Sequence, residues 1–375
     1  MRLTYLMPAP FKQALLTAVI LQSMHAYAET TEYQLPVITV QAVHTDSELL
    51  STSASIQKVQ AATVQNNANV NLSEVLQGVA GLQINNRENY AQDLQISMRG
   101  FGARSTFGVR GIRMYVDGIP ATMPDGQGQS SNIDLNSLDH IEVLTGPFSS
   151  LYGNSSGGTI LTETKEGQGK DSIQVGLNAG SHHKQQANIQ LQGGSEQANQ
   201  PAYVISSSYF DTDGFRDHSA AQKVLNNAKL TWNLEDGSKI NWVMNRVDID
   251  ADDPQGLKRE QWKANPKQVN DSKNTYNVRK EIEQTQTGLT WTKPLNDQQE
   301  LYSMFYLGNR QVVQYQSIPK EFQENDRHAG GVIDFDRDYY GADFRWTGKA
   351  LLPNTTLVAG VALDRMVEDR KGYKN

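Results

Sequence analysis

The fold of this chain is decided by residues 95–129, which read QISMRGFGARSTFGVRGIRMYVDGIPATMPDGQGQ, and by residues 141–160, which read IEVLTGPFSSLYGNSSGGTI. In both stretches short apolar runs alternate with turn clusters such as Asp117-Gly118. Short alternating runs bounded by glycine, proline and aspartate indicate strands joined by tight turns. We therefore expect a compact domain of short strands around these two stretches.

Composition excludes several classes of function. The chain has 375 residues, of which 38% are apolar and 20% charged, and its net charge is −7. An acidic chain lacks the excess of lysine and arginine on which nucleic-acid binding depends. The absence of cysteine from the sequence removes disulfides, thiolate metal sites and cysteine nucleophiles. We expect no cofactor and no metal site. Loose calcium binding by the acidic runs in the long loops, Asp248/Asp250/Asp252 and Asp334/Asp336/Asp338, is left open.

The first 28 residues have the pattern of a secretory signal peptide. Arg2 and Lys12 precede an apolar run, and Ala26-Tyr27-Ala28 has the small-x-small form of a cleavage site. A buried N-terminal helix is the alternative interpretation. The apolar run is shorter than the about 20 residues that a membrane-spanning helix needs. A membrane protein with this sequence would therefore have to be a closed barrel, because lipid satisfies no unpaired backbone group.

A short strand-forming segment follows the predicted cleavage site, and a polar tether extends from it to residue 55. We find no local hairpin partner for it in the sequence. An extended segment on a tether suits recognition by β-augmentation, in which the sheet edge of a partner supplies the missing hydrogen bonds. An edge strand of the next domain is the alternative. The segment consists of Leu35, Pro36, Val37, Ile38, Thr39, Val40, Gln41 and Ala42.

Residues 71–81, NLSEVLQGVAG, predict one short helix. Asn71 can cap it, with Glu74 three residues later as in a capping box, and Gly81 can end it. We also expect a short helix over residues 136–140. The remainder to residue 165 is strand and turn, which makes this domain α+β.

From residue 171 onward, apolar and polar residues alternate with period two in about nine strands. Alternation alone fits a soluble sandwich as well as a membrane barrel. The connections distinguish the two, because they are short after every second strand and become long and polar after the others. Short turns at one end and long loops at the other are typical of outer-membrane barrels. The short connections are residues 193–200, 235–238, 293–298 and 349–355, and the longest are 249–283 and 310–336.

Residues 153–157, GNSSG, match the G-x-S-x-G pattern of a hydrolase nucleophile elbow. That elbow requires a helix after the serine, whereas Thr159-Ile160-Leu161-Thr162 predicts a strand. We therefore expect no enzyme activity.

Four arginines, Arg99, Arg104, Arg110 and Arg113, are interleaved with glycine and phenylalanine. They suit ion pairs with a barrel wall, and they suit equally an outer mouth that attracts an anionic ligand. We leave both interpretations open. The candidate ligand-binding residues are Arg104, Arg110, Arg113, Gln127 and Gln129.

In these motifs the chain resembles the TonB-dependent outer-membrane receptors. The resemblance covers the whole chain, and residues 35–42 resemble the TonB box. Residues 98–111 and 123–129 are most similar to receptors of the siderophore and ferric-dicitrate type. The plug signatures that carry the resemblance contain Arg99, Gly100, Asp117, Gly118, Glu142, Gly146, Pro147, Tyr152, Gly153, Gly157 and Gly158.

The resemblance implies an α+β plug domain followed by an antiparallel transmembrane β-barrel, with about nine of an expected 22 strands present. The implied domains are a signal peptide (1–28), the TonB box and linker (29–55), the plug (56–169) and part of the barrel (170–375). The implied function is binding of a ferric chelate and its import across a Gram-negative outer membrane with energy from TonB and its inner-membrane complex. The implied partners are TonB, the chelate and outer-membrane lipid. Cobalamin, copper or a sugar is the alternative cargo, and a truncated binding module without transport is the other alternative.

Two departures from the family pattern modify these expectations. Thr145 stands where the family usually has Arg or Lys, so we expect a weakened ionic lock between plug and barrel that retains Arg99. The strands are also about thirteen fewer than closure requires, and an open sheet edge is not viable in lipid. We therefore expect a fragment or a prematurely ended reading frame.

Overall fold

The computed structural model describes residues 38–41, 44, 47–50, 52–61, 70–105, 108–128, 130–194, 197–269, 276–325, 327–353 and 355–375. The predicted signal peptide lies outside these residues, as do Leu35, Pro36, Val37, Ala42 and Gln129. Residues 39–375 form one compact unit, to which all elements below belong.

The first domain of this unit is built on a mixed five-stranded sheet with the order β3-β10-β11-β7-β8. β11 and β7 are parallel and the other neighbours are antiparallel. Two small ribbons, β4 with β5 and β6 with β9, complete the domain. The bounds are β3 Ser55–Gln60, β4 Leu82–Asn85, β5 Gln95–Met98, β6 Val109–Arg110, β7 Ile112–Val116, β8 Ile119–Pro120, β9 Gln127–Gly128, β10 Leu138–Thr145, α2 Ser149–Tyr152 and β11 Gly158–Thr164.

One apolar core holds this domain together, and it contains residues of both stretches that decide the fold. Ile96 and Met98 of β5 pack with Ile112 and Met114 of β7 and with Ile160 of β11, and all five are fully buried. Burial of side chains of this size stabilises a fold by roughly 1.5–3 kcal/mol each. The predicted domain of short strands is confirmed.

The two predicted helices have different outcomes. Over residues 71–81 the structure has the 3₁₀ helix η2, Leu72–Glu74, and the Glu74 carboxylate accepts the Asn71 backbone N–H at 2.8 Å as the capping box requires. The helix is shorter than expected, and left-handed Gly78 (φ 86°) and Gly81 (φ 79°) turn the chain after it. The helix predicted over residues 136–140 is wrong: Leu138 starts β10, because pairing with β3 and β11 outweighs the local pattern.

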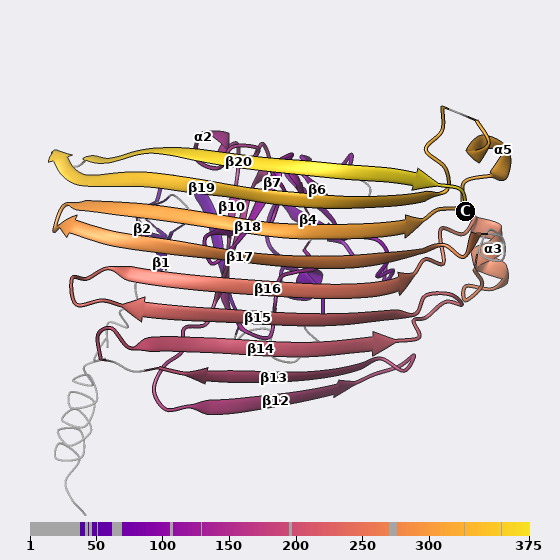
Figure 1. Ribbon diagram of the computed structural model, residues 1–375, viewed down its shortest axis with the longest axis horizontal. Helices are drawn as coiled ribbons and strands as arrows, with labels where there is room; N and C mark the ends of the chain where they lie inside the picture. The colour runs from indigo at the N-terminus through magenta and orange to yellow at the C-terminus, as the bar shows by residue number, and fades with distance from the viewer. Residues whose placement is uncertain are drawn as a thin grey trace, which may run out of the picture. The chain divides into compact units, whose positions relative to one another are not determined.

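The second part of the unit is one antiparallel sheet, which has nine strands within the described residues, in the sequential order β12 to β20 (Figure 1). Turns of a few residues join strands at one end, whereas the connections with α3 (Arg259–Ala264) and α5 (Lys320–Gln323) lie at the other. The predicted strand number and alternation of connection lengths are confirmed. The bounds are β12 Ser172–Ala179, β13 Gln185–Gly193, β14 Pro201–Thr212, β15 Ala221–Asn233, β16 Lys239–Asp252, β17 Arg279–Asn296, β18 Gln299–Tyr315, β19 Val332–Leu352 and β20 Thr355–Tyr373.

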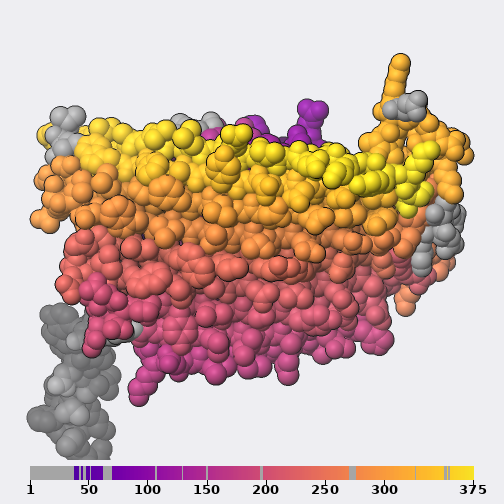
Figure 2. All heavy atoms as spheres, viewed as in Figure 1, coloured from indigo at the N-terminus to yellow at the C-terminus, as the bar shows by residue number. Residues whose placement is uncertain are grey.

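The two faces of this sheet are the reverse of those of a soluble sheet. The face turned away from the first domain exposes large apolar side chains, among them Ile189, Phe305 and Leu363, and Figure 2 shows that its strands form a continuous surface. The opposite face carries buried polar side chains such as Lys229 and Gln284. An apolar outer face with a polar inner face is the pattern of a membrane barrel. None of the helices in the described ranges is long and apolar enough to cross a membrane.

Candidate functional site

A buried ion pair joins the first domain to the sheet. Asp117, in the β7–β8 turn, accepts from Lys229 of β15, with 2.6 Å between Oδ1 and Nζ. The side chains are 1% and 4% exposed. Lys229 also donates to the Thr164 carbonyl at 3.0 Å, and the Thr164 N–H donates to Asp117 at 3.0 Å. A charge removed from water in this way is tolerated only with such partners, so the two parts are fixed to each other here.

Two further ion pairs cross the same interface. Lys280 of β17 lies 2.8 Å from Asp93, and both side chains are nearly buried. Arg113 of β7 lies 3.1 Å from Asp364 of β20, whose other oxygen accepts from the Tyr306 hydroxyl at 2.7 Å. For Arg113 the ion-pair interpretation therefore holds. Sequence reasoning missed Lys229, Lys280 and Asp364, because periodicity places a residue on a face but does not identify its partner.

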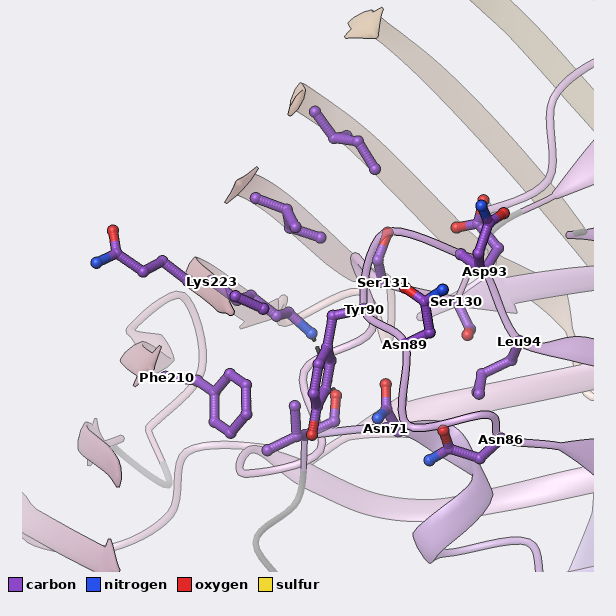
Figure 3. A pocket seen from close by; sticks show the side chains of 16 residues that line it. Asn71, Asn86, Asn89, Tyr90, Asp93, Leu94, Ser130, Ser131, Phe210 and Lys223 are labelled. Carbon is purple, nitrogen blue, oxygen red and sulfur yellow. Dashed lines mark hydrogen bonds between the residues drawn. The ribbon is translucent and has the colours of Figure 1, made fainter. Parts of the chain in front are cut away.

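A small polar pocket of about 40 Å³ lies in the seam between the domain and the sheet (Figure 3). Tyr90 lies beside Phe210 in Figure 3, and the centres of the two rings are 5.0 Å apart. The Asn89 amide donates to Asp253 at 2.7 Å, and Lys223 donates to the Val70 carbonyl at 3.3 Å. A polar cavity of this size can hold water. The seam is therefore a hydrogen-bonded contact and differs from the dry core of the domain.

The N-terminal strand segment is docked on the first domain as far as the structure describes it. β1 (Thr39–Val40) pairs with β2 (Ser47–Glu48), so the expectation that it has no local partner is wrong for these residues. Val40 is fully buried, and its insertion into an apolar cluster explains why the short pairing is stable. The Gln41 N–H donates to Glu142 at 2.9 Å, and Lys58 donates to the Thr39 carbonyl at 3.0 Å.

Glu142, a motif residue on β10, is the centre of that docking. Its Oε1 lies 3.5 Å from both Lys58 Nζ and His140 Nε2. Burial alone would raise the pKa of Glu142, but the hydrogen bonds from His140 and from the Gln41 N–H, with the charge of Lys58, hold the pKa below its usual value. Glu142 is therefore an ionised acceptor that ties the segment to the sheet, which its motif did not indicate.

His44, just beyond β1, makes a second link. Its Nδ1 meets the Arg345 guanidinium, its Nε2 lies 3.2 Å from the Leu151 carbonyl, and its ring is 4.5 Å from that of Tyr152. Burial, and then the charge of Arg345, lower the pKa of His44 to about 4. A neutral imidazole with its proton on Nε2 satisfies both contacts. The motif residue Tyr152 is thus part of this packing.

The other motif residues mainly shape turns. An added Cβ at Gly118 (φ 79°) would lie 2.8 Å from the Tyr302 hydroxyl, so a larger residue there would require the end of the Tyr302 side chain to shift. A positive φ is also found at four other motif glycines, Gly100, Gly146, Gly153 and Gly158. Gly157 faces Phe101, and Pro147 is exposed.

The lock expected of Arg99 is absent among the described residues. Arg99 is exposed and belongs to none of the ion pairs found there. Thr145 is buried and donates its hydroxyl to the Ser55 carbonyl at 3.2 Å. Asp117, Arg113 and Asp93 make ion pairs to the sheet instead.

The serine of the G-x-S-x-G match is not placed as a nucleophile. Ser155 is fully buried, donates to the Gly158 carbonyl at 2.9 Å and lies 2.9 Å from the Thr159 hydroxyl. A nucleophile elbow exposes its serine. In the described part of the chain, no three His, Asp or Glu residues are grouped to hold a metal ion.

Of the candidate ligand-binding residues, Arg110 and Gln127 line one cavity together, and the sheet contributes Arg310 and Arg337 to it. Arg104 is exposed, Arg113 is ion-paired to Asp364, and Gln129 lies outside the described residues.

A small α+β domain ion-paired to the polar face of an antiparallel sheet with an apolar outer face defines the class of plugged membrane barrels. Residues 48–159 match the family model of the TonB-dependent Receptor Plug Domain. Residues 48–159 thus match the plug domain of the TonB-dependent receptors, and the antiparallel sheet that follows has the fold of part of the barrel in the solved structures of this kind.

Three comparisons agree with this assignment. The metal-pseudopaline receptor CntO of Pseudomonas aeruginosa is 27% identical over 115 residues, which are 30% of this chain and 16% of that protein. The vitamin B12 transporter BtuB of Vibrio vulnificus is 23% identical over 192 residues, 51% of this chain and 30% of that protein. The structure of the unliganded ferric citrate transporter FecA has a TM-score of 0.68 and 17% identity, covering 90% of this chain and 50% of that one. The chain thus spans half or less of the length of each.

Proposed function

We propose that this protein serves TonB-dependent uptake of a ferric chelate of the siderophore type across the outer membrane of a Gram-negative bacterium. The observation that carries the proposal is the buried Asp117–Lys229 pair, which fixes a plug on the polar side of strands whose other side is apolar. Such a plug closes a wide lumen until it is moved. Transport therefore needs an input of work, which is the role we assign to TonB.

The docked N-terminal segment supports the proposal that TonB supplies the work that moves the plug. In our proposal a signal peptide at 1–28 directs export, cargo binds at the outer end of the plug, and TonB pairs with residues 35–42 by β-augmentation. Thr39 and Gln41 are hydrogen-bonded to Lys58 and Glu142 on β3 and β10. A pull on the segment would thus act directly on the central sheet of the plug.

The test is iron uptake in an outer-membrane host with and without TonB. Expression of the protein should support growth on at least one chelate from a panel under iron limitation, and deletion of TonB should abolish that growth. Outer-membrane fractionation and heat-modifiable gel mobility would verify that the barrel is present. Equal growth without TonB, or no iron phenotype with any chelate, would contradict the proposal.

Cobalamin is the second candidate cargo, because the similarity to the vitamin B12 transporter spans 192 residues of this chain. Cobalamin-dependent growth of a host that lacks its own transporter distinguishes the two. Growth rescued by cobalamin and unaffected by iron chelates would select the second candidate. Copper and sugars are tested by the same replacement of the nutrient.

A further inference from the structure

A cavity of about 60 Å³ lies where the β6–β9 ribbon of the plug meets β18 and β19. The plug contributes Arg110 and Gln127, and the strands contribute Arg310 and Arg337. Three guanidinium groups around one small space are unfavourable without an anion, since like charges repel strongly away from bulk water.

Arg310 is the best buried of these arginines, and it is incompletely paired. It is only 2% exposed, and its Nη1 meets the side-chain oxygen of Gln284. Its Nη2 is buried with no hydrogen-bond partner within the described residues. A buried donor of a charged group left without an acceptor is more destabilising than a neutral donor in the same position. The site is therefore built for an acceptor that enters from outside.

Neighbouring carboxylates do not fill this role at Arg310, because Glu368 is paired with Arg337, another arginine of the cavity, and Asp93 is paired with Lys280. Glu368 accepts from Arg337 Nε at 2.5 Å, while the Arg337 guanidinium also lies 4.4 Å from the centre of the Phe335 ring. Asp93 is bound to Lys280 at 2.8 Å. Arg110 is exposed at the plug end of the cavity. The cavity thus keeps an excess of positive charge.

We infer that this cavity binds one carboxylate group of the cargo, with Arg310 Nη2 as its principal donor. The inference rests on the proposed function and names the chemical class of the cargo, a chelate that presents a free or weakly coordinated carboxylate. The cavity of about 60 Å³ is far too small for a whole chelate, but it exceeds the about 10–15 Å³ that one water molecule needs, so one carboxylate substituent fits. Arginine suits this task because its planar fork matches a carboxylate.

The test measures binding of two probes to the full chain in outer-membrane vesicles. The probes are ferric citrate, which carries carboxylates, and a neutral ferric trihydroxamate. Arg310→Met should weaken ferric citrate binding by about tenfold or more, the loss expected for a charged hydrogen bond, and should leave trihydroxamate binding unchanged. Arg310→Lys keeps the charge without the fork and should fall between the wild type and Arg310→Met.

The matched control is Arg246→Met, the same substitution in β16 at a half-exposed arginine outside the cavity, which should change neither affinity. Iron-free citrate is a second probe, and it should raise the melting temperature of the wild type but not of Arg310→Met. If neither ferric citrate nor citrate distinguishes Arg310→Met from the wild type, the cavity holds only water and the inference is wrong. Equal loss for both chelates would also overturn it. TonB-dependent uptake that is unchanged in Arg310→Met would reject the carboxylate site and keep the proposed function. Citrate binding that depends on Arg310 but is not followed by uptake would keep the carboxylate site and reject the proposed function.

Discussion

Lys229 Nζ and Asp117 Oδ1 lie 2.6 Å apart, and almost nothing of either side chain reaches solvent. The two residues belong to different parts of the chain, the barrel strand β15 and the β7–β8 turn of the plug. The pair thus places the Asp117 motif of the plug opposite one defined position of strand β15. It fixes the position of the plug relative to the sheet, and the ion pair has to break if the plug moves out.

Lys229→Met should therefore loosen the plug strongly. It leaves the Asp117 carboxylate buried with its hydroxyl and amide donors but without a counter-charge, which typically costs about 3–5 kcal/mol. The expected result is faster protease cleavage of the plug and a lower denaturant midpoint for its unfolding, while the strands remain inserted.

Lys239→Met is the matched control, because Lys239 pairs with Glu166 where both side chains are 37% exposed. An exposed pair contributes at most about 1 kcal/mol. If both variants lose the same stability, burial of the Asp117–Lys229 pair is not what holds the plug.

A second prediction concerns Gly118. Gly118→Ala adds a Cβ at 2.8 Å from the Tyr302 hydroxyl, and the Tyr302 ring is itself held 3.9 Å from the Arg345 guanidinium. The left-handed backbone (φ 79°) costs about 1 kcal/mol for any side chain, and the crowding should add about 1–3 kcal/mol. Denaturant unfolding of the plug measures the sum.

Gly100→Ala isolates the backbone contribution, since Gly100 has φ 87° and an added Cβ there meets no atom within 4 Å. Gly100→Ala should lose only the about 1 kcal/mol of unfolding free energy that the left-handed backbone costs. Equal losses of unfolding free energy for Gly118→Ala and Gly100→Ala would mean that the Tyr302 side chain moves aside at no cost.

The sequence predicted the domain of short strands, the number of strands in the sheet and the alternation of their connections, because each depends on local patterns of period two and on turn residues. The family resemblance alone identified that domain as a plug. The sequence did not predict the ion pairs that join this domain to the sheet. The family motif pointed to Arg99, whereas the ion pairs to the sheet are made by Asp117 and Arg113. Their partners, Lys229 and Asp364, are more than one hundred residues away in sequence, where a local pattern cannot identify them. Nor could it show that Val40 is buried, since an isolated strand-former has the same pattern whether it is docked or free.

Ile38→Pro tests the assignment of residues 35–42 to TonB coupling. Proline removes a backbone donor that an augmenting strand would use, and Ile38 is half exposed and precedes the β1–β2 pairing. Uptake should be abolished while binding of the chelate to whole cells is unchanged. Ile38→Ala keeps the amide and should retain uptake. Equal loss of binding and uptake in the proline variant would show instead that the segment supports the cargo site.

The docking of the N-terminal segment should weaken in acid because of His44. Its pKa in the folded protein is about 4, below the ordinary value of 6.5, owing to burial and to Arg345. The docked state therefore binds fewer protons than the released state between these values, so the stabilisation present above pH 6.5 is lost as the pH falls toward 4. Protonation would also place an N–H of His44 against the Arg345 guanidinium.

Since the chain has no cysteine, a spin label at Thr39→Cys reports the docking alone. Its mobility should be low at pH 7.5 and should rise at pH 5. In a His44→Gln background, the amide can still accept from Arg345 and donate to Leu151 but does not titrate, so the mobility should stay low at both pH values. A rise of the same size in that background would assign the effect to His140 and Glu142, whose contact with the segment also involves titratable groups.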